Sequence, residues 1–552
     1  MPGYSCSLKQ LLKLISKNEV TLENLEYYLD CVKSEFKGYD TESDDLKLEN
    51  NDTNRPDLWS AEGTARQILG CHFNEHKNYD FFEKEAKADN KIIASESVNQ
   101  IRPFIGGFSV SGITVDDPLL NQIIQAQEKL CDNFGRMRKL IAIGVYDAQH
   151  IKLPIHYDAV NPKQTSFPPL GFEEEMTLSE ILEKHPKGIQ YANIVEQFDT
   201  YPLITDNSGH VLSFPPVINS NDLGKVKPGD TNLFVEVTGT DVMAVTLAVN
   251  IMACNLSDHG AIIEPFITEY SSGEKSKLPF RFTDSIEIKI DSLEKLCGDK
   301  VDIKTLKDAL IRMGHKVTVN ADSCICIPAP YRRDCLHSVD LAEDYCIAVG
   351  FNNFEPVLPD SFTVGGEAEH TKRAKLIQEL LVGMNFQEVM TYILTSKDNQ
   401  CAKMEHKDAI IEIGNPMTET FGVVRERLLP ILLEIESKNP RAEYPHRIFE
   451  TGETAHLSSK TTEGVETVHK AGALIAHGDA NFSEIHSVLQ ALMYYLNEEY
   501  SLSETDNPSF IQGRVGKIIS NGRDIGIIGE VHPQVLENWG ITMPCAGFEI
   551  LI

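Results

Sequence analysis

Apolar residues recur along the chain with two spacings, and each spacing predicts a different kind of element. Intervals of three and four residues predict helices over 8–16 and 22–32, because such residues share one face of a helix. Alternating or continuous apolar runs predict strands at 105–115, 140–145, 210–218 and 232–237. Longer helical patterns at 118–139 and 241–256 interrupt these strands. The first half of the chain is therefore predicted to be α+β.

The second half of the chain predicts two further arrangements. Residues 275–350 indicate a compact winged or swapped helix-turn module, with elements predicted at 281–290 (strand), 303–313 (helix), 316–320 and 323–328 (strands) and 339–348 (helix). After residue 355, helices alternate with strand runs, predicted at 410–413, 446–450, 470–477 and 525–528. A mostly antiparallel sheet flanked by helices fits that order. No period of about 20 to 50 residues recurs, which excludes a solenoid.

These patterns predict an α+β multidomain protein. Its 552 residues exceed a single core, since domains average roughly 150 residues. The expected domains are a small mixed N-terminal module, an α+β domain, the helix-turn module and the sheet domain, at 1–85, 91–270, 275–352 and 355–552. A charged stretch at 76–90 is predicted to be a linker. The apolar share of 41% and the charged share of 24% argue against extensive disorder.

The net charge of -31 by itself argues against binding nucleic acid, because phosphates are normally met by a basic surface. Short basic groups do occur at 136–139, 332–333, 372–375 and 425–427. Taken alone, these groups indicate solvated or ion-paired faces. If RNA binds this chain, a partner chain is expected to supply much of the positive field.

Twelve cysteines without any C-x-x-C motif predict neither a zinc ribbon nor a disulfide framework. The first helix carries Lys9 and Lys13, so it does not resemble a secretion signal. The most apolar window, 242–254, covers 13 residues, fewer than the roughly 20 that span a bilayer. We therefore expect a cytoplasmic protein without a membrane segment.

An acidic cluster is the clearest candidate metal site. Asp340, Glu343 and Asp344 are spaced i, i+3, i+4 and share one face of the predicted helix, while Asp334 can return from the preceding loop. Hard cations such as magnesium prefer grouped oxygen ligands of this kind. A solvated helix start favoured by the helix dipole is the alternative interpretation.

A second metal pattern lies at 72–76, where His72, Glu75 and His76 satisfy the H-x-x-E-H motif of inverted zinc proteases. Two histidines four residues apart on a helix could hold zinc, with Glu75 as the base. A third ligand is missing from the motif, and a charged connector follows it. A surface position is favoured over a metal-dependent hydrolase.

The stretches 212–220 and 230–241 combine small polar groups with apolar neighbours but contain no nucleophile and base of the triad type. Periodicity alone predicts a core strand followed by a helix that is capped by Thr240 or Asp241.

Four motifs, in order along most of the chain, carry a family resemblance. They are NRPDLWSAEG at 54–63, RIFETGE at 447–453, GRVG at 513–516 and GEVHPQVLENWG at 529–540. Together they resemble the beta subunit of phenylalanyl-tRNA synthetase, in the shorter form of archaea and the eukaryotic cytosol. The resemblance implies an ATP-dependent ligase that charges tRNA(Phe) with phenylalanine, assembled with an alpha subunit as an (alpha-beta)2 heterotetramer.

The resemblance also assigns roles to residues. It implies Mg²⁺ at Asp334, Asp340, Glu343 and Asp344, near the alpha subunit. It makes 91–270 an editing domain that hydrolyses Tyr-tRNA(Phe), because a pocket for phenylalanine rejects an added hydroxyl only weakly. The implied editing pocket consists of Ser213, Asn219, Glu236 and Thr238.

Within that pocket, Glu236 is expected to accept the phenol hydroxyl, while the other three residues line the pocket or orient the aminoacyl ester. Hydrolysis by a positioned water is expected.

The last domain resembles the class II synthetase catalytic fold, but Glu530 stands where that fold needs an arginine to hold ATP. The domain is therefore expected to be inactive in amino-acid activation. A structural and RNA-binding scaffold with a decayed editing site is the second hypothesis.

Overall fold

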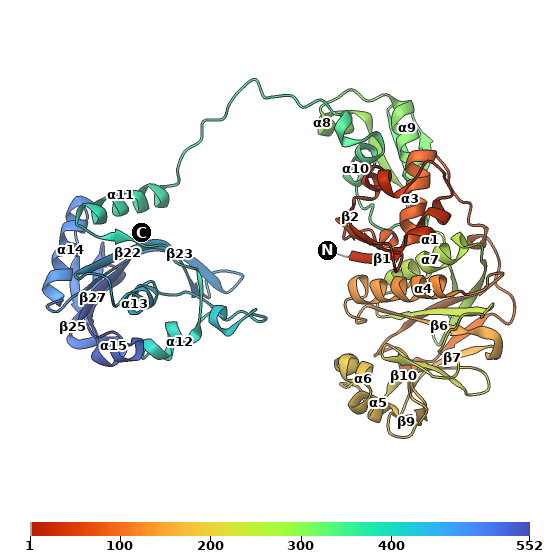
Figure 1. Cartoon of the computed structure of the whole chain (residues 1–552), viewed down its shortest axis with the longest axis horizontal. Coiled ribbons are helices and arrows are strands. Elements are labelled where there is room, and N and C mark those ends of the chain that lie inside the picture. The colour runs from red at the N-terminus through yellow and green to blue at the C-terminus, as the bar shows by residue number, and fades with distance from the viewer. Residues whose placement is uncertain (1–2) are drawn as a thin grey trace. The chain divides into compact units, whose positions relative to one another are not determined.

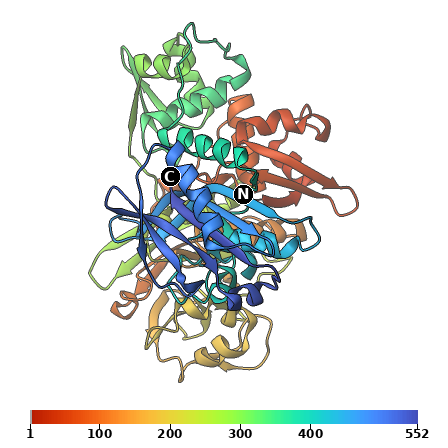
Figure 2. The ribbon, with the colours of Figure 1, turned by 90° about the vertical axis from the view of Figure 1, so that its left-hand side faces the viewer.

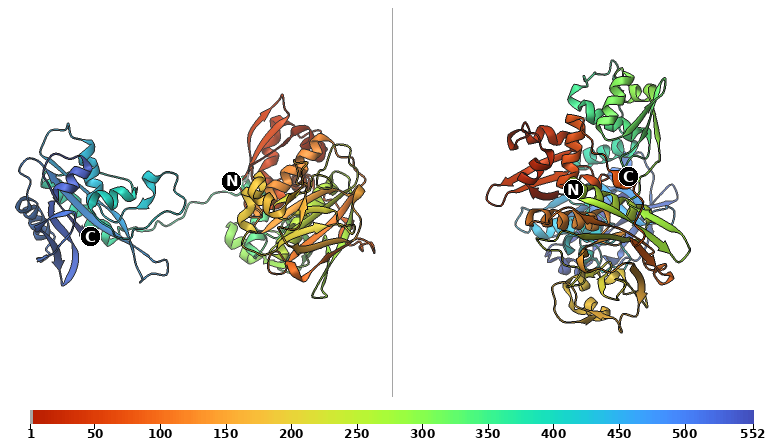
Figure 3. Two further views of the ribbon diagram at one scale, coloured as in Figure 1. Left: turned by 90° about the horizontal axis from the view of Figure 1, so that it is seen from below. Right: turned by 90° about the vertical axis from the view of Figure 1, so that its right-hand side faces the viewer.

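The computed structural model describes residues 3–552, which fold as two compact units divided between Leu358 and Pro359. Residues 355–368, which connect the units, have no helix or strand (Figure 3). Three of the expected domains fall in the first unit and most of the fourth falls in the second.

The first unit begins with a small mixed module. Its sheet has the order β1-β3-β2, with strands at Gly3–Ser7, Asp45–Asn50 and Ser34–Asp40. Its helices are α1 (Leu8–Ile15), α2 (Leu25–Leu29) and α3 (Ala61–Phe73). The predicted helix 22–32 is helical throughout, but only α2 is an α-helix, because 3₁₀ turns precede and follow it. Ser60 caps α3 by accepting a hydrogen bond from the Gly63 N–H at 3.2 Å.

A large sheet forms the centre of the first unit. Its strands are, in spatial order, β12 (Ile218–Asn219), β11 (Val211–Phe214), β10 (Tyr201–Thr205), β7 (Ile155–Val160), β4 (Lys91–Ala94), β14 (Ile262–Tyr270), β5 (Phe104–Ser111), β13 (Leu233–Gly239) and β6 (Ile141–Asp147), with β15 (Lys275–Leu278) paired to β14. Only β4 pairs in parallel, with both of its neighbours. The patterns of 141–147 and 233–239 were recognised, whereas β4, β7, β10 and β14 were not predicted.

Helices α4 (Asp117–Lys129) and α7 (Val242–Asp258) pack on one face of this sheet, against its core at β5, β13 and β6 (Figure 1). Asp241 caps α7, which confirms one of the two predicted caps. The predicted helix 118–139 is too long, because α4 ends in a π-turn at 130–134. Residues 136–138 then adopt left-handed conformations.

Two short helices, α5 (Leu178–Lys184) and α6 (Pro186–Tyr191), pack beside β10 and β11 with the hairpin of β8 (Ser166–Phe167) and β9 (Met176–Thr177). They lie at the end of the first unit opposite α8 and α9 (Ile290–Cys297 and Ile303–Arg312; Figure 2). Neither α5 nor α6 was predicted from the sequence.

The helix-turn module has a three-stranded sheet of order β16-β18-β17, with strands at Ile286–Lys289, Ser323–Ile327 and Lys316–Val319. Helices α8, α9 and α10 (Ser338–Val349) pack with it. The strand predicted at 281–290 is shorter in the structure, where β16 begins only at Ile286. The predicted linker at 76–90 is also corrected, because Tyr79, Phe81 and Phe82 are buried in the central core.

The second unit has a seven-stranded sheet. Its strands are, in spatial order, β19 (Gln387–Glu388), β22 (His446–Leu457), β23 (Val465–Ala476), β27 (Cys545–Leu551), β26 (Arg523–Val531), β25 (Phe510–Ser520) and β24 (Ser501–Glu504). All pairs except β19 with β22 are antiparallel. A separate two-stranded sheet pairs β20 (Leu394–Thr395) with β21 (Val423–Val424). The predicted strand 410–413 is wrong, since only Glu412 makes a single bridge there.

Helices cover both faces of the seven-stranded sheet (Figure 1). One face packs against α11 (Glu369–Gly383) and α14 (Phe482–Tyr495), and the other against α13 (Leu429–Lys438) and α15 (Pro533–Trp539). A short helix, α12 (Lys397–Gln400), lies near α13. Within residues 3–552, no helix has the length and apolar character needed to cross a bilayer.

Candidate functional site

A cavity of about 370 Å³ opens in the central domain, between α4, the strands β6 and β13, and the turn from β11 to β12. Three of the four residues predicted for the editing pocket line it: Ser213, Asn219 and Glu236. Apolar side chains of α4 and β6, among them Ile123 and Ile143, form much of the wall. The cavity is therefore largely apolar, with a few polar groups, as ligand sites usually are.

Glu236 is the buried acid of this cavity, with 2% of its surface exposed. Its Oε1 accepts a hydrogen bond of 2.8 Å from the Tyr146 hydroxyl, while Oε2 has no hydrogen-bond partner among residues 3–552. Burial raises the pKa of Glu236 to about 7, although the Tyr146 hydroxyl and the Arg102 charge lower it. The Ser213 hydroxyl is also buried and lacks a partner within the described chain.

Tyr146 was missed by the sequence analysis. It lies on β6, is fully buried and faces Glu236 across the β6–β13 pair. A glycine at position 144 makes room for this pair, because a Cβ there would collide with both the Tyr146 hydroxyl and Glu236 Oε1. In the sequence, the Gly-Val-Tyr run at 144–146 does not by itself indicate a site. Its role follows only from the pairing of β6 with β13.

Thr238 does not line the cavity. Its hydroxyl accepts a hydrogen bond of 3.0 Å from Arg102 Nε, and its carbonyl accepts one of 2.8 Å from Arg102 Nη2. Arg102 also donates to the carbonyls of Arg138 and Lys139. The buried Arg102 therefore ties β13 to the left-handed loop that follows α4.

That loop also places a positively charged side chain, that of Arg138, at the cavity. Arg138 lines the cavity and donates to the carbonyls of Pro216 and Val217 at 3.1 and 3.0 Å. Lys187 and Lys225 also line it. The basic run at 136–139 was noticed in the sequence, but its position beside the acid was not.

The four predicted magnesium ligands divide into two pairs. Asp334 and Asp344 are buried and bound by Arg332, whose guanidinium donates to Asp334 at 2.6 and 3.1 Å and to Asp344 at 2.7 and 3.2 Å. These contacts lower the pKa of Asp334 to about 2 against the opposing effect of burial, and Arg332 and His315 lower that of Asp344. Both carboxylates are therefore already paired.

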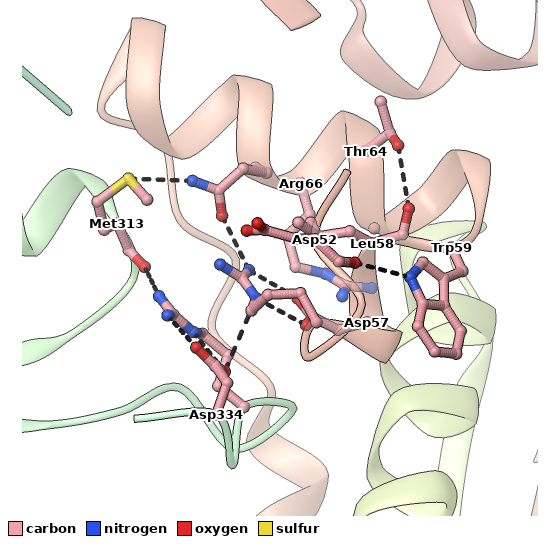
Figure 4. A network of polar contacts seen from close by, with 12 residues as sticks. Asp52, Asp57, Leu58, Trp59, Thr64, Arg66, Met313 and Asp334 are labelled. Atoms are coloured by element: carbon pink, nitrogen blue, oxygen red, sulfur yellow. Dashed lines mark hydrogen bonds and ion pairs between the residues drawn. The ribbon is translucent and has the colours of Figure 1, made fainter. Parts of the chain in front are cut away.

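Figure 4 shows the network that holds Asp334. Arg55, from the NRPDLWSAEG motif, forms a bidentate pair with Asp57 at 2.8 and 2.9 Å and an ion pair with Asp334 at 3.8 Å. The motif therefore contributes a buried cation that joins the N-terminal module to the helix-turn module. Two buried arginines, Arg55 and Arg332, face three buried carboxylates.

The other pair of acids is accessible on α10. Asp340 Oδ2 accepts hydrogen bonds of 2.7 Å from the N–H groups of Leu336 and His337, and Glu343 contacts Lys33. Within residues 3–552, two groups of His, Cys, Asp or Glu lie close enough to hold a metal, and they include only Asp344 of the four acids. The magnesium site stays a prediction.

The H-x-x-E-H motif does not converge on one metal. Glu75 pairs with Lys17 at 2.5 Å, and the His76 ring lies near Gly70. His72 instead lies beside two cysteines, Cys31 and Cys71.

In the second unit, charged groups on the sheet bind one another. Glu530 accepts from the Phe482 N–H at 2.8 Å and from Arg514 at 2.6 Å. Arg425 donates to the buried Glu450 at 2.6 Å. Glu530 and Glu450 are therefore already paired with donors of the chain itself.

The chain matches known proteins over its whole length. Two family models match: "tRNA synthetase B5 domain" at 286–351 and "Phenylalanyl tRNA synthetase beta chain CLM domain" at 355–552. The phenylalanine–tRNA ligase beta subunit of Borreliella burgdorferi strain ZS7 is 40% identical over 561 residues, which covers 100% of this chain and 99% of that protein. That of Borrelia garinii subsp. bavariensis is 39% identical with the same coverage.

A solved structure supports the same family assignment. An N-terminal fragment of the phenylalanyl-tRNA synthetase beta subunit from Pyrococcus horikoshii is 36% identical and superposes with a TM-score of 0.60, covering 63% of this chain and 99% of the fragment. With full-length relatives near 40% identity and a matching fold, this chain belongs to the family of phenylalanine–tRNA ligase beta subunits.

Proposed function

We propose that this chain, as the beta subunit of phenylalanine–tRNA ligase, proofreads by hydrolysing Tyr-tRNA(Phe) in the Glu236 cavity. The complex charges tRNA(Phe) with phenylalanine, and the chain is expected to contribute tRNA positioning and assembly as well as editing.

One observation carries the editing proposal: Glu236 Oε2 is a buried acceptor without a hydrogen-bond partner in residues 3–552, at the wall of an apolar cavity. A buried carboxylate oxygen left unpaired costs free energy. The hydroxyl of a tyrosyl group supplies the missing donor, whereas a phenylalanyl group of the same shape leaves the oxygen unpaired. A polar site of this kind discriminates far more strongly than an apolar pocket does.

Other residues that line the cavity match the ester and phosphate groups of the substrate. Ser213 and Asn219 offer polar groups beside Glu236, within reach of an aminoacyl ester. Arg138, Lys187 and Lys225 offer positive charge for the phosphates of the tRNA end. A positioned water, assisted by the free ribose hydroxyl, is the proposed nucleophile, and Thr238 acts by holding Arg102 and the strand in place.

We propose that magnesium binds at the helix-turn module through Asp340 and Glu343. Asp334 and Asp344 lie deeper in the module and add negative charge near the ion. Mg²⁺ usually takes one or two protein carboxylates and keeps its waters. Asp340 and Glu343 are spaced i, i+3 on α10, so they share a face, and their charges are less neutralised than those of the two buried acids. The ion would add positive charge at the surface that meets the alpha subunit.

The remaining assignments are proposals of the same kind. The second unit is an inactive class II-like domain that packs on an alpha subunit within an (alpha-beta)2 heterotetramer, and the complex works in the cytoplasm. The expected domains, at 1–85, 91–270, 275–352 and 355–552, stay a prediction, although Tyr79, Phe81 and Phe82 of the first and β15 of the third pack in the central domain. The Pyrococcus fragment supports the shorter archaeal or eukaryotic form, and the relatives from Borreliella and Borrelia are covered over 99% of their own length.

Deacylation of preformed Tyr-tRNA(Phe) by the assembled complex tests the editing proposal. Glu236→Ala removes a charged acceptor, so we expect kcat/KM for hydrolysis to fall about 10- to 100-fold while phenylalanine charging stays near normal. Glu173→Ala, at an exposed position of the same domain, is the control. Unchanged hydrolysis in Glu236→Ala would contradict the role of Glu236, and a wild-type complex without deacylase activity would favour the scaffold hypothesis.

A further inference from the structure

Two cysteines and a histidine converge in the N-terminal module, away from the editing cavity. Cys31 lies in the 3₁₀ turn Asp30–Val32, and Cys71 and His72 lie in the last turn of α3. One candidate ligand atom from each, a sulfur or a ring nitrogen, lies within 4.8 Å of the other two. The fold therefore brings together residues that are 40 positions apart in the sequence.

This cluster is buried and incompletely bonded. Cys31 and Cys71 are 5% and 3% exposed, and His72 is half-buried. His72 Nε2 is buried without a hydrogen-bond partner among residues 3–552. Since buried polar atoms in native proteins nearly always have partners, an unpaired nitrogen on a ring that lies beside two thiols points to a missing ligand.

The surroundings act differently on the three side chains. Burial raises the pKa of Cys31, whose thiol donates to the Tyr28 carbonyl at 3.3 Å, so this ligand must lose its proton when a metal binds. Hydrogen bonding from the Cys31 thiol and the nearby charge of Arg312 lower the pKa of Cys71, against the effect of burial. Arg312 also donates to the Cys71 carbonyl at 3.0 Å. Burial lowers the pKa of His72, which keeps its ring neutral near pH 7. A thiolate and a neutral imidazole are the forms that coordinate metals.

We propose that Cys31, Cys71 and His72 bind a zinc ion that fastens the 3₁₀ turn at 30–32 to the end of α3. Two sulfur ligands and one nitrogen ligand suit Zn²⁺, and three protein ligands leave one tetrahedral position for water. Binding replaces the thiol protons, and the two thiolates balance the charge of the ion.

This site differs from the H-x-x-E-H interpretation of the sequence. It uses His72 but neither Glu75, which pairs with Lys17, nor His76, whose ring lies near Gly70. Because both sulfur ligands are buried, we assign the ion a structural role, in which it stabilises the folded module rather than hydrolysing a substrate.

Metal content of the full-length chain tests the proposal. After loading with Zn²⁺ and removal of excess metal, we expect about one zinc per chain, and Co²⁺ in its place should give cobalt–thiolate absorption. Zinc should fall to background in Cys71→Ser and in His72→Gln, the second of which changes a half-buried position and is expected to fold. Cys297→Ser is the control, because Cys297 Sγ lies 3.6 Å from another cysteine, Cys346 Sγ, outside the proposed site.

Thermal unfolding gives a second measurement. Zn²⁺ should raise the Tm of the wild-type chain and of Cys297→Ser but not of His72→Gln, because a ligand stabilises only the state that binds it. Zinc retained equally by both site variants would overturn the proposal. So would a wild-type chain with no zinc above background, or one whose mass and thiol count show a Cys31–Cys71 disulfide.

Discussion

At the scale of single residues, the pairing of Tyr146 with Glu236 sets the chemistry of the cavity. The carboxylate is buried, which favours its neutral form, and the tyrosine hydroxyl partly offsets this by donating to Oε1. A pKa near 7 means that the acceptor form becomes dominant as the pH rises through neutrality. Editing should therefore depend on pH in the physiological range.

We predict that kcat/KM for Tyr-tRNA(Phe) hydrolysis rises through a midpoint near pH 7, after the spontaneous rate is subtracted. Tyr146→Phe removes the donor that stabilises the carboxylate, so the midpoint should move to higher pH. Tyr270→Phe is the control, since the Tyr270 hydroxyl donates to the Ile105 carbonyl instead. A profile in Tyr146→Phe that matches the wild type would show that this hydrogen bond does not tune Glu236.

At the scale of elements, the start of α10 is fastened by buried ion pairs to the NRPDLWSAEG loop before α3. Arg55 and Arg332 bridge the two modules through Asp57, Asp334 and Asp344. Breaking a buried pair leaves an uncompensated charge, which is more damaging than loss of a surface pair. The motif that carried the family resemblance therefore has a structural role as well.

Asp334→Asn should lower the free energy of unfolding of the first unit by about 3 kcal/mol, because Arg332 and Arg55 lose a carboxylate. The folded-state pKa of Asp334, about 2, lies below the ordinary value of about 3.9, so its contribution is present above pH 4 and is lost as the pH falls towards 2. Urea unfolding between pH 2 and 7 measures both effects. The exposed Asp322→Asn serves as control, and equal acid sensitivity in Asp334→Asn and wild type would refute this role.

At the scale of the whole molecule, assembly is the property that the magnesium proposal addresses. Asp340 also caps α10 through the Leu336 and His337 N–H groups, so an alanine there would disturb the helix as well as a metal. Amide replacements keep the acceptor and the size of the side chain while removing the charge.

The double variant Asp340→Asn with Glu343→Gln should therefore fold normally but assemble more weakly with the alpha subunit, by about tenfold in Kd at micromolar Mg²⁺, with partial recovery at millimolar Mg²⁺. Sedimentation of the co-expressed subunits over a magnesium series measures this. Asp299→Asn, at an exposed position of the same module, is the control. Assembly that is insensitive to magnesium in both wild type and variant would remove the metal from the interface.

The sequence by itself determined the local elements whose patterns depend on near neighbours: α1, the capped start of α7, the strands β6 and β13, and the helices α9 and α10 of the helix-turn module. It also determined the family, because motifs such as NRPDLWSAEG are specific as strings of residues. Local periodicity failed for β4, β7, β10 and β14, whose pairing partners include strands far along the chain.

Only the tertiary structure decided which side chains meet. Glu236 and Ser213 could be named from the resemblance, but Tyr146 is 90 positions from Glu236 and gains its role through the pairing of β6 with β13. In the same way, His72 was a member of a sequence motif whose true neighbours, Cys31 and Cys71, are set by the packing of α3 against the turn at 30–32. Hydrogen bonds and ligand sets depend on distances of a few ångströms, and folding alone fixes these between residues that the sequence keeps apart.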